Sequence, residues 1–258
     1  MRKLDTMPET LKLLKNCPKE LFYLGDKTLL ERKKISIVGS RKPTKYSRQM
    51  TQELASKLSK AGVCIVSGGA MGIDAMAHSG AGNANTIAVL PCGLEHKYPA
   101  VNAALLSEIE KKGLLLSQFV PAFKATAWSF VLRNEIVVAL GDVLVVSEAE
   151  LGSGSMRSVE FALAMGKEIY VLPHHIDESS ATQKLLEDGK AKAIYDIDTF
   201  VAKFGVREAV HVQEDDFTRF CKTNPSYEEL LRKYPQRAFE AELSGEIEVK
   251  NARVFYFN

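Results

Sequence analysis

Two turns rich in glycine and serine hold the residues best suited to bind a charged ligand. The first turn, residues 39–41, reads Gly-Ser-Arg and follows a short apolar run. The second turn, residues 67–72, reads Ser-Gly-Gly-Ala-Met-Gly and follows another apolar run. Such turns leave backbone N–H groups unpaired at the start of a helix, where the helix dipole also favours an anion, above all a phosphate. Arg41 can donate two hydrogen bonds to one phosphate, so the two turns predict a phosphate-binding surface.

Basic residues are concentrated around the first of these turns. Residues 27–60 hold ten Lys or Arg and two acids, a balance of +8, whereas the whole chain has a net charge of +2. Residues 206–258 hold eight basic and ten acidic residues, a balance of −2. A local excess of basic side chains is typical of a surface that binds a polyanion. We therefore expect Lys42 and Lys45, beside Arg41, to contribute to polyanion binding.

Other chemistries find less support. The dinucleotide pattern GxGxxG is missing after the first apolar run, so we expect no NAD-type cofactor. The four cysteines form no CxxC pair, and His174-His175 lacks an evident third ligand, so we expect no metal. Asp74 and His78 lie four residues apart and could form an acid–base couple, although a capping acid and a structural histidine fit the pattern better.

Two further segments could complete a nucleic-acid site. Residues 128–134, Trp-Ser-Phe-Val-Leu-Arg-Asn, join two aromatic side chains to a cation. Phe130 and Trp128 could stack on nucleobases or pack in the core, and the sequence leaves both readings open. Residues 152–155 form another Gly-Ser turn before a helix. The three glycines at 68, 69 and 72 suggest that a ligand backbone approaches the second turn closely.

Short apolar runs alternate with helical patterns through most of the chain. We predict strands at residues 35–38, 63–66, 86–90, 114–116, 143–146 and 169–172, with a possible edge strand at 194–195. This pattern predicts an α/β fold with a doubly wound, mostly parallel sheet, extended and Rossmann-like. Right-handed crossovers place every strand-to-helix turn at one edge of the sheet, so the turns at Gly39, Gly68 and Gly152 should converge.

The same pattern divides the chain into three parts. We expect a helical N-terminal appendage at residues 1–34, a Rossmann-like domain at 35–205, and a winged-helix-like domain of three helices and a hairpin at 206–258. The chain has no apolar run of about 18 residues and no apolar core near its N-terminus, so we expect a cytoplasmic protein without a membrane span.

In combination, these motifs resemble the DNA-processing protein A (DprA/Smf) family, and the match looks closest to the epsilonproteobacterial form. The resemblance is carried by Val38–Arg41, Ser67–Asp74, Ala77-His78, Tyr98-Pro99, Arg133-Asn134 and Ser153–Ser155, in order over residues 35–200. It implies a homodimer that binds single-stranded DNA, protects incoming strands in natural transformation and helps load the RecA recombinase. The sequence departs from the family pattern at Glu135, which replaces a common arginine, and at His174, which replaces a common glycine.

The expected function is thus sequence-independent binding of single-stranded DNA, without catalysis. The C-terminal domain, with its slightly acidic balance, is expected to contact a protein. One alternative is a nucleotide phosphoribohydrolase of the lysine-decarboxylase-like type, although Glu160 stands six residues after Gly154 instead of four. Another is a sensor of small nucleotides. The DNA-binding residues that we expect are Gly39, Ser40, Arg41, Lys42, Lys45, Gly68, Gly69, Phe130, Arg133, Asn134, Ser153, Gly154 and Ser155.

Overall fold

Successive side chains of each central strand are buried under opposite layers of helices. Ile35 and Ile37 pack in one core, whereas Val38 packs in the other. Strands that are apolar on both faces form a sheet covered on both sides, and parallel strands are of this kind. The six predicted parallel strands are confirmed, as β3 (Lys34–Val38), β4 (Cys64–Ser67), β5 (Thr86–Val89), β6 (Leu114–Ser117), β7 (Val143–Val146) and β8 (Ile169–Val171).

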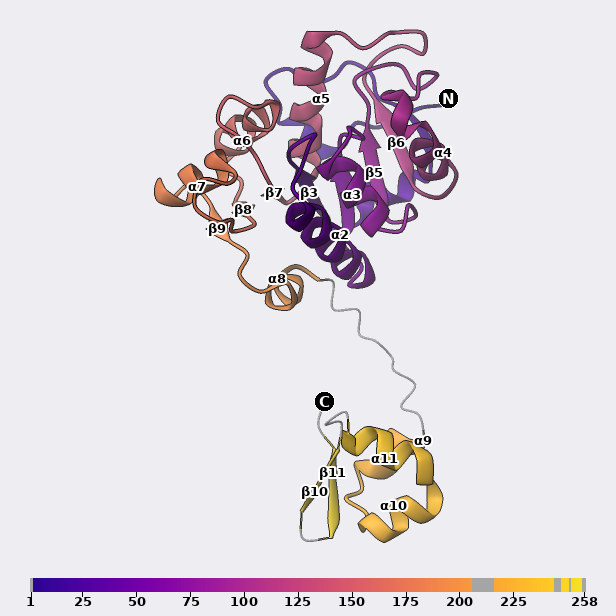
Figure 1. Ribbon diagram of the computed structural model, residues 1–258. Coiled ribbons are helices and arrows are strands. Elements are labelled where there is room, and N and C mark those ends of the chain that lie inside the picture. The colour runs from indigo at the N-terminus through magenta and orange to yellow at the C-terminus, as the bar shows by residue number, and fades with distance from the viewer. Residues whose placement is uncertain (1, 206–215, 244–246, 251, 257–258) are drawn as a thin grey trace. The chain divides into compact units, whose positions relative to one another are not determined.

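The computed structural model describes residues 2–205, 216–243, 247–250 and 252–256 (Figure 1). The chain forms two compact units, Met1–Arg207, called the main unit below, and Glu208–Asn258, called the C-terminal unit.

The order of strands places a reversal in the middle of the sheet. The nine-stranded sheet runs β1-β2-β6-β5-β4-β3-β7-β8-β9. The winding changes direction between β3 and β7, which are neighbours in the sheet but far apart in the sequence. In open α/β sheets, the crevice beyond the carboxyl ends of the strands at such a reversal is the usual ligand site. The edge strands are β1 (Arg2–Lys3), β2 (Phe22–Gly25) and β9 (Lys192–Ala193).

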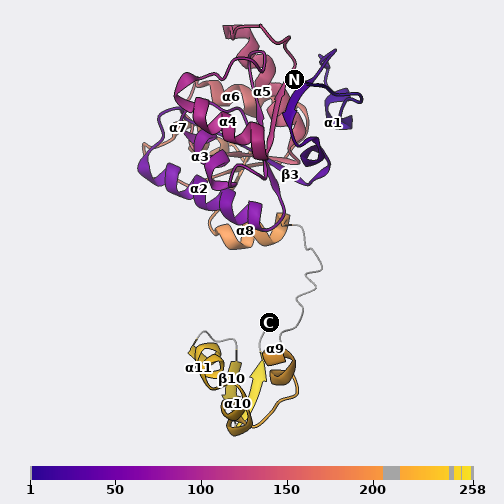
Figure 2. The same cartoon turned by 90° about the vertical axis from the view of Figure 1, so that its right-hand side faces the viewer.

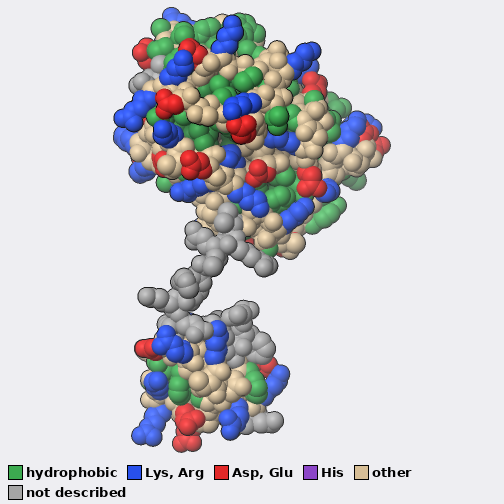
Figure 3. Space-filling view, turned by 180° about the vertical axis from the view of Figure 1, so that it is seen from behind, with side chains coloured by type: hydrophobic (Ala, Val, Ile, Leu, Met, Phe, Trp, Pro, Cys, Tyr) green, Lys and Arg blue, Asp and Glu red, His purple; other side chains and the backbone are tan. Residues whose placement is uncertain are grey.

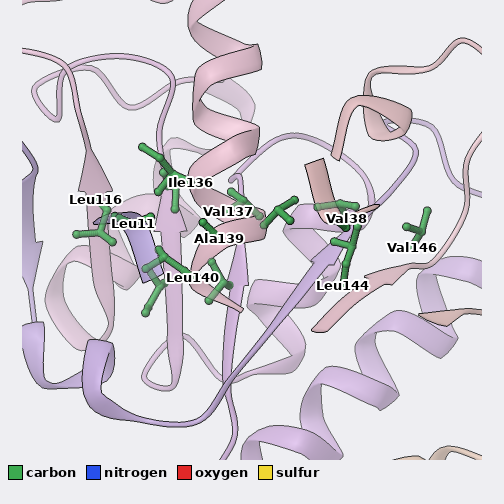
Figure 4. Packing of buried hydrophobic residues seen from close by; sticks show 14 of the residues in the cluster. Leu11, Val38, Leu116, Ile136, Val137, Ala139, Leu140, Leu144 and Val146 are labelled. Carbon is green, nitrogen blue, oxygen red and sulfur yellow. The ribbon is translucent and has the colours of Figure 1, made fainter. Parts of the chain in front are cut away.

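Each face of the sheet carries its own layer of helices (Figures 1 and 2). One layer consists of α2 (Lys45–Lys60), α3 (Ile73–Gly80), α4 (Ala103–Lys112) and α8 (Ile197–Phe204). The other layer consists of α1 (Glu9–Lys12), α5 (Ala127–Leu140), α6 (Gly154–Ala164) and α7 (Ser180–Glu187). Figure 4 shows Ile136, Val137 and Leu140 of α5 among the strand side chains, so α5 is anchored directly on the sheet. Two short 3-10 helices complete the main unit, η1 (Lys27–Glu31) and η2 (Ala100–Asn102).

The N-terminal residues are part of the main sheet, which corrects the expectation of a separate helical appendage at residues 1–34. Strand β2 pairs antiparallel with β6, and β1 pairs antiparallel with β2. Leu11 of α1 is fully buried in the same core as α5. The apolar run at residues 21–25 indicated burial, but its pairing partner lies nearly a hundred residues away and left no local signal.

The C-terminal unit has three helices and a two-stranded antiparallel hairpin, in the order that the sequence predicts. Its elements are α9 (Asp216–Cys221), α10 (Tyr227–Lys233), α11 (Pro235–Leu243), β10 (Ile247–Lys250) and β11 (Arg253–Tyr256). Phe217, Leu230, Ile247 and Val254 form its core. The predicted hairpin ends at Glu246 and Phe257 and the turn residue Asn251 lie outside the described residues. Within the described part of the chain, no helix has the length and apolar character needed to cross a membrane.

Candidate functional site

The strand-to-helix turns meet in one cleft of about 600 Å³. It lies at the carboxyl edge of the sheet, where the winding reverses, so the predicted convergence of the Gly39 and Gly68 turns is confirmed. The segment after Gly152 enters the same cleft from the start of α6. The expected site residues that line it are Gly39, Ser40, Arg41, Gly68, Phe130, Arg133, Asn134, Ser153, Gly154 and Ser155. Lys42, Lys45 and Gly69 are not among the lining residues.

Arg41 stands at this cleft on a loop that backbone hydrogen bonds fix on two sides. The Ser40 N–H donates to the Glu148 carbonyl at 2.8 Å, and the Ser40 carbonyl accepts from the Ile73 N–H at 3.1 Å. The Arg41 side chain is exposed, and its guanidinium lies 5.5 Å from the centre of the Phe130 ring. A cation–π contact holds the guanidinium in place while leaving its N–H donors available to a ligand.

The second glycine turn is closed by a carboxylate of the protein itself. Asp74 Oδ2 accepts the N–H groups of Gly68 and Ala70, both at 3.2 Å. Burial raises the pKa of Asp74, while nearby Arg133 and the backbone hydrogen bonds act in the opposite direction. The expectation that these N–H groups face a bound phosphate is wrong, because Asp74 already occupies them.

Arg133 is a buried residue of α5 that bonds to the same closed turn. Only 4% of its surface is exposed. Its Nη1 donates to the carbonyls of Gly68 and Val89, the latter at 3.1 Å, and its Nε donates to Asn134 Oδ1 at 3.0 Å. Arg133 borders the cleft, but these bonds assign it to holding β4, β5 and α5 together. The sequence suggested that Arg133 binds phosphate, because a sequence alone does not show that a side chain is buried.

The glycines of this turn make room for the protein, not for a ligand. A side chain on Gly68 would meet the Arg133 guanidinium and lie 2.8 Å from Asp74 Oδ2. On Gly72, which has a φ of +78°, it would come within 2.7 Å of the Arg41 backbone. Gly69 faces Leu90 and Leu106. Internal packing therefore explains the three glycines, and the expectation of a closely approaching ligand is corrected.

The start of α6 is arranged in the opposite way. A side chain on Gly154 would meet no atom within 4 Å. Ser153, at the N-cap, makes no side-chain capping bond, and its Oγ is buried without a hydrogen-bond partner among the described residues. Asn134 Nδ2 donates weakly to the Gly154 carbonyl at 3.5 Å. This helix start therefore presents unused donors to the cleft, the geometry that binds an anion.

Aromatic side chains stand beside these donors. The Phe130 ring lies 5.5 Å from the Arg41 guanidinium and 5.8 Å from that of Arg133. Tyr98 meets the ring edge-on, with 5.7 Å between ring centres. The cleft thus offers an apolar ring next to an exposed cation, which suits a ligand with both a planar base and a phosphate.

The side chain of Glu148, which follows β7, reaches the start of α2. Its Oε2 accepts from the Thr44 N–H at 2.8 Å and from the Thr44 hydroxyl at 2.9 Å. Burial raises the pKa of Glu148, but hydrogen bonds from Ser47 and Thr44 outweigh this effect and lower it overall. His174 Nε2 lies 2.8 Å from Ser47 Oγ, so this histidine belongs to the same structural network.

His78 has a structural role as well. Its Nδ1 lies 2.7 Å from Thr86 Oγ1, and that hydroxyl donates onward to the Ile65 carbonyl at 2.8 Å. His78 must therefore donate from Nδ1, which leaves Nε2 as a buried acceptor without a partner among the described residues. Burial, together with the nearby positive charge of Arg133, lowers the pKa of His78 to about 3. Of the two interpretations of Asp74 and His78, the structural one holds. In the described residues, no group of three His, Cys, Asp or Glu is placed to hold a metal ion.

The basic cluster at residues 27–60 is divided by the fold. Lys27 and Lys33 precede β3 and lie at its amino end, whereas Arg41, Lys42 and Lys45 follow it at the carboxyl end. The expectation that the whole excess of +8 surrounds the first turn is therefore wrong. On the face that Figure 3 presents, acidic and basic side chains are interspersed over the main unit.

Several residues that line the cleft were not expected from the sequence. Tyr98 appeared only as part of a family motif, and Asp74, Glu150 and Arg157 were not proposed as part of this surface. Two of them carried a usable signal. Tyr98 follows the turn after β5 at the carboxyl edge, and Arg157 lies one helical turn after Ser153 on α6.

The family model described as DNA recombination-mediator protein A matches residues 2–205. The chain belongs to this family. It is 37% identical to the DNA processing protein DprA of Bacillus subtilis over 193 residues, which are 73% of this chain and 65% of that protein. It is 33% identical to the Streptococcus pneumoniae DNA processing protein DprA over 78% of this chain and 72% of that protein.

Solved structures of this recombination-mediator family share the fold. DNA processing protein A from Helicobacter pylori, whose structure is described as giving insight into its single-stranded DNA binding mode, has a TM-score of 0.77 and 41% identity over 78% of this chain and 94% of that chain. The S. pneumoniae protein has a TM-score of 0.73 and 31% identity over 80% of this chain and 75% of that chain. The chain spans 65% of the length of the Bacillus relative and 52% of the Synechocystis Smf protein.

Proposed function

We propose that this chain binds single-stranded DNA irrespective of sequence, in the cytoplasm, and protects incoming strands during natural transformation. As a homodimer it would then help to load a RecA-type recombinase, with the C-terminal unit contacting a protein. Membership of the recombination-mediator family supports this proposal, as does the single-stranded DNA binding of the H. pylori protein.

One observation carries the DNA-binding part of the proposal. Arg41 and the open start of α6 face the same cleft, with Phe130 in contact with the Arg41 guanidinium. An exposed cation and unused helix donors suit backbone phosphates, and the ring suits a nucleobase. Phosphate contacts and stacking both tolerate any sequence, so this combination predicts binding without base specificity.

Replacing Arg41 tests the proposal directly. Arg41→Ala should weaken binding to all single-stranded oligonucleotides alike and reduce the dependence of affinity on salt by about one phosphate contact. Lys60→Ala is the matched control, because it removes the same charge from the far end of α2, about 22 Å from Lys45 by helix geometry. Gel-shift titrations over a salt series measure both effects. Equal losses in the two variants, or none in either, would contradict a site at the cleft.

A non-enzymatic role is part of the proposal. The carboxylates of Asp74 and Glu148 are engaged by backbone or hydroxyl donors of the protein. Glu160, the candidate acid of a phosphoribohydrolase, forms an exposed ion pair with Arg157 at 2.8 Å and is not a lining residue of the cleft. Incubation with nucleoside monophosphates should therefore release no free base, and released base would overturn this part.

A further inference from the structure

Trp128, the single tryptophan of the chain, lies beside the cleft without lining it. It sits in the first turn of α5, and 53% of its surface is exposed. The indole is supported from behind, because Phe119 and Phe123 each meet it edge-on with 5.5 Å between ring centres. Those two rings stack on each other at 4.5 Å. Trp128, Phe119 and Phe123 thus form an aromatic cluster in which the indole is held in place and exposed to solvent.

This surface continues the apolar side of the cleft. Ala127, Phe130 and Val131 of α5 line the cleft. Residues three apart are neighbours on a helix surface, so Val131 lies next to Trp128. Val131 is itself exposed. A chain that leaves the cleft past Phe130 therefore meets Val131 and then the indole.

The loop behind Trp128 is tied to the loop that carries Tyr98. The Gly93 N–H donates to the Phe123 carbonyl at 2.8 Å, and His96 Nε2 lies 3.1 Å from the Ala122 carbonyl. Gly93 also packs against the backbone of Pro121, where a side chain would not fit. These two loops are thus held in place before any ligand binds, which reduces the entropy lost on binding.

We infer that Trp128 is a second stacking position for a nucleobase of the strand that occupies the cleft. This inference rests on the proposed function and extends its binding site beyond the cleft. Every nucleobase has a planar face that can stack on the indole, so stacking needs no particular base. Lys124, exposed four residues earlier in the chain, supplies a cation on the same segment for the backbone of the strand.

The single tryptophan makes the test direct. Intrinsic fluorescence of the full chain is titrated with oligothymidylates of about 4 to 16 nucleotides. Quenching should appear only with oligonucleotides long enough to extend past the cleft. Trp128→Ala should bind these long oligonucleotides roughly fivefold to a hundredfold more weakly and the shortest ones unchanged. Trp128→Phe, which keeps an aromatic ring, should recover part of the loss and show that the fold is intact.

The outcomes separate the inference from the function on which it rests. Arg41-dependent binding without quenching, and with equal affinities of Trp128→Ala and the unaltered chain at all lengths, would overturn the inference alone. A change of oligomeric state in Trp128→Ala, with no dependence on oligonucleotide length, would assign the surface to a protein contact and overturn it as well. Failure of the unaltered chain to bind any single-stranded oligonucleotide would overturn the proposed function.

Discussion

The turn after β4 and the start of α6 both bring backbone N–H groups to the head of a helix, yet they differ in what occupies them. At the first, Asp74 accepts the N–H groups of Gly68 and Ala70. At the second, Ser153 makes no capping bond and Gly154 faces open space. One turn is closed by the protein and the other is open to a ligand. Two similar sequence patterns therefore serve stability in one place and, by our proposal, binding in the other.

The difference lies in one residue near the start of each helix. Asp74 is the second residue of α3 and reaches back to its own turn, whereas Ser155, the second residue of α6, carries no charge. A carboxylate in the first turn of a helix competes with any external anion for the same donors. A Gly-Ser turn therefore predicts an anion site only when no acid of the protein already fills it.

The strongest test of the closed turn is Asp74→Ala. The substitution leaves the N–H groups of buried Gly68 and half-buried Ala70 without this acceptor and removes the charge that faces buried Arg133. We expect the free energy of unfolding to fall by about 3 kcal/mol or more, measured by chemical denaturation. Glu160→Ala, which breaks an exposed ion pair, should change it by about 0.5 kcal/mol at most. An Asp74→Ala chain of undiminished stability would mean that the turn is not held closed by this carboxylate.

A methyl group at each glycine compares the two turns directly. Gly68→Ala should lower the free energy of unfolding by about 2–3 kcal/mol, because the new carbon meets Arg133 and Asp74. Gly154→Ala should leave stability unchanged or raise it by up to about 1 kcal/mol, since alanine favours the helix. The same methyl enters the cleft and should weaken DNA binding several-fold. Thermal unfolding and gel shifts on the two variants give both quantities, and DNA binding unaffected by Gly154→Ala would contradict an open site at α6.

His78 makes the stability of the fold around α3 depend on pH. The unfolded chain takes up a proton at His78 below about pH 6.5, whereas the folded chain does so only near a pKa of about 3. Stability is therefore lost as the pH falls below 6.5, by about 1.4 kcal/mol per pH unit, or about 2 kcal/mol by pH 5. His78→Asn keeps a donor for Thr86 but cannot titrate. Denaturation curves at several pH values should show a shallower acid slope in the variant, and parallel slopes would exclude His78 as the source.

Much of the fold could be predicted because its signals are local. The strand from Val143 to Val146 has the predicted bounds, since an apolar run shows in a few neighbouring residues. The place of β2 in the sheet and the existence of α8 were missed. Pairing of β2 with β6 depends on a distant partner, and α8 is short and follows the edge strand closely.

The candidate site was predictable in its position but not in its chemistry. Connectivity alone brought the turns at Gly39 and Gly68 to one edge of the sheet. The burial of Arg133 and the hydrogen bonds of Asp74 to the Gly68 turn could not be predicted from the sequence. Both depend on contacts between side chains and backbone of different elements. Arg41 is different, because it is exposed on a strand-end loop and lines the cleft, so its binding role stays a prediction that the structure permits.

Ser153→Ala is the finest comparison of an open with a closed helix start. Ser153 Oγ has no partner among the described residues, so its removal should leave the free energy of unfolding nearly unchanged. Thr44, the N-cap of α2, accepts from the Ser47 N–H and donates to Glu148, so Thr44→Ala should cost about 1 kcal/mol of stability.

DNA binding should respond in the opposite order. A phosphate oxygen in the cleft would give the Ser153 hydroxyl an acceptor after a rotation of its side chain, and a hydrogen bond to a charged group stabilises a complex by about 1 kcal/mol or somewhat more. Ser153→Ala should therefore bind single-stranded oligonucleotides about fivefold more weakly at unchanged stability. Thr44→Ala should mainly reduce stability and affect DNA binding less. Equal affinity of Ser153→Ala and the unaltered chain, measured at low salt where phosphate contacts are strongest, would place the phosphate elsewhere in the cleft and leave Arg41 as its main contact.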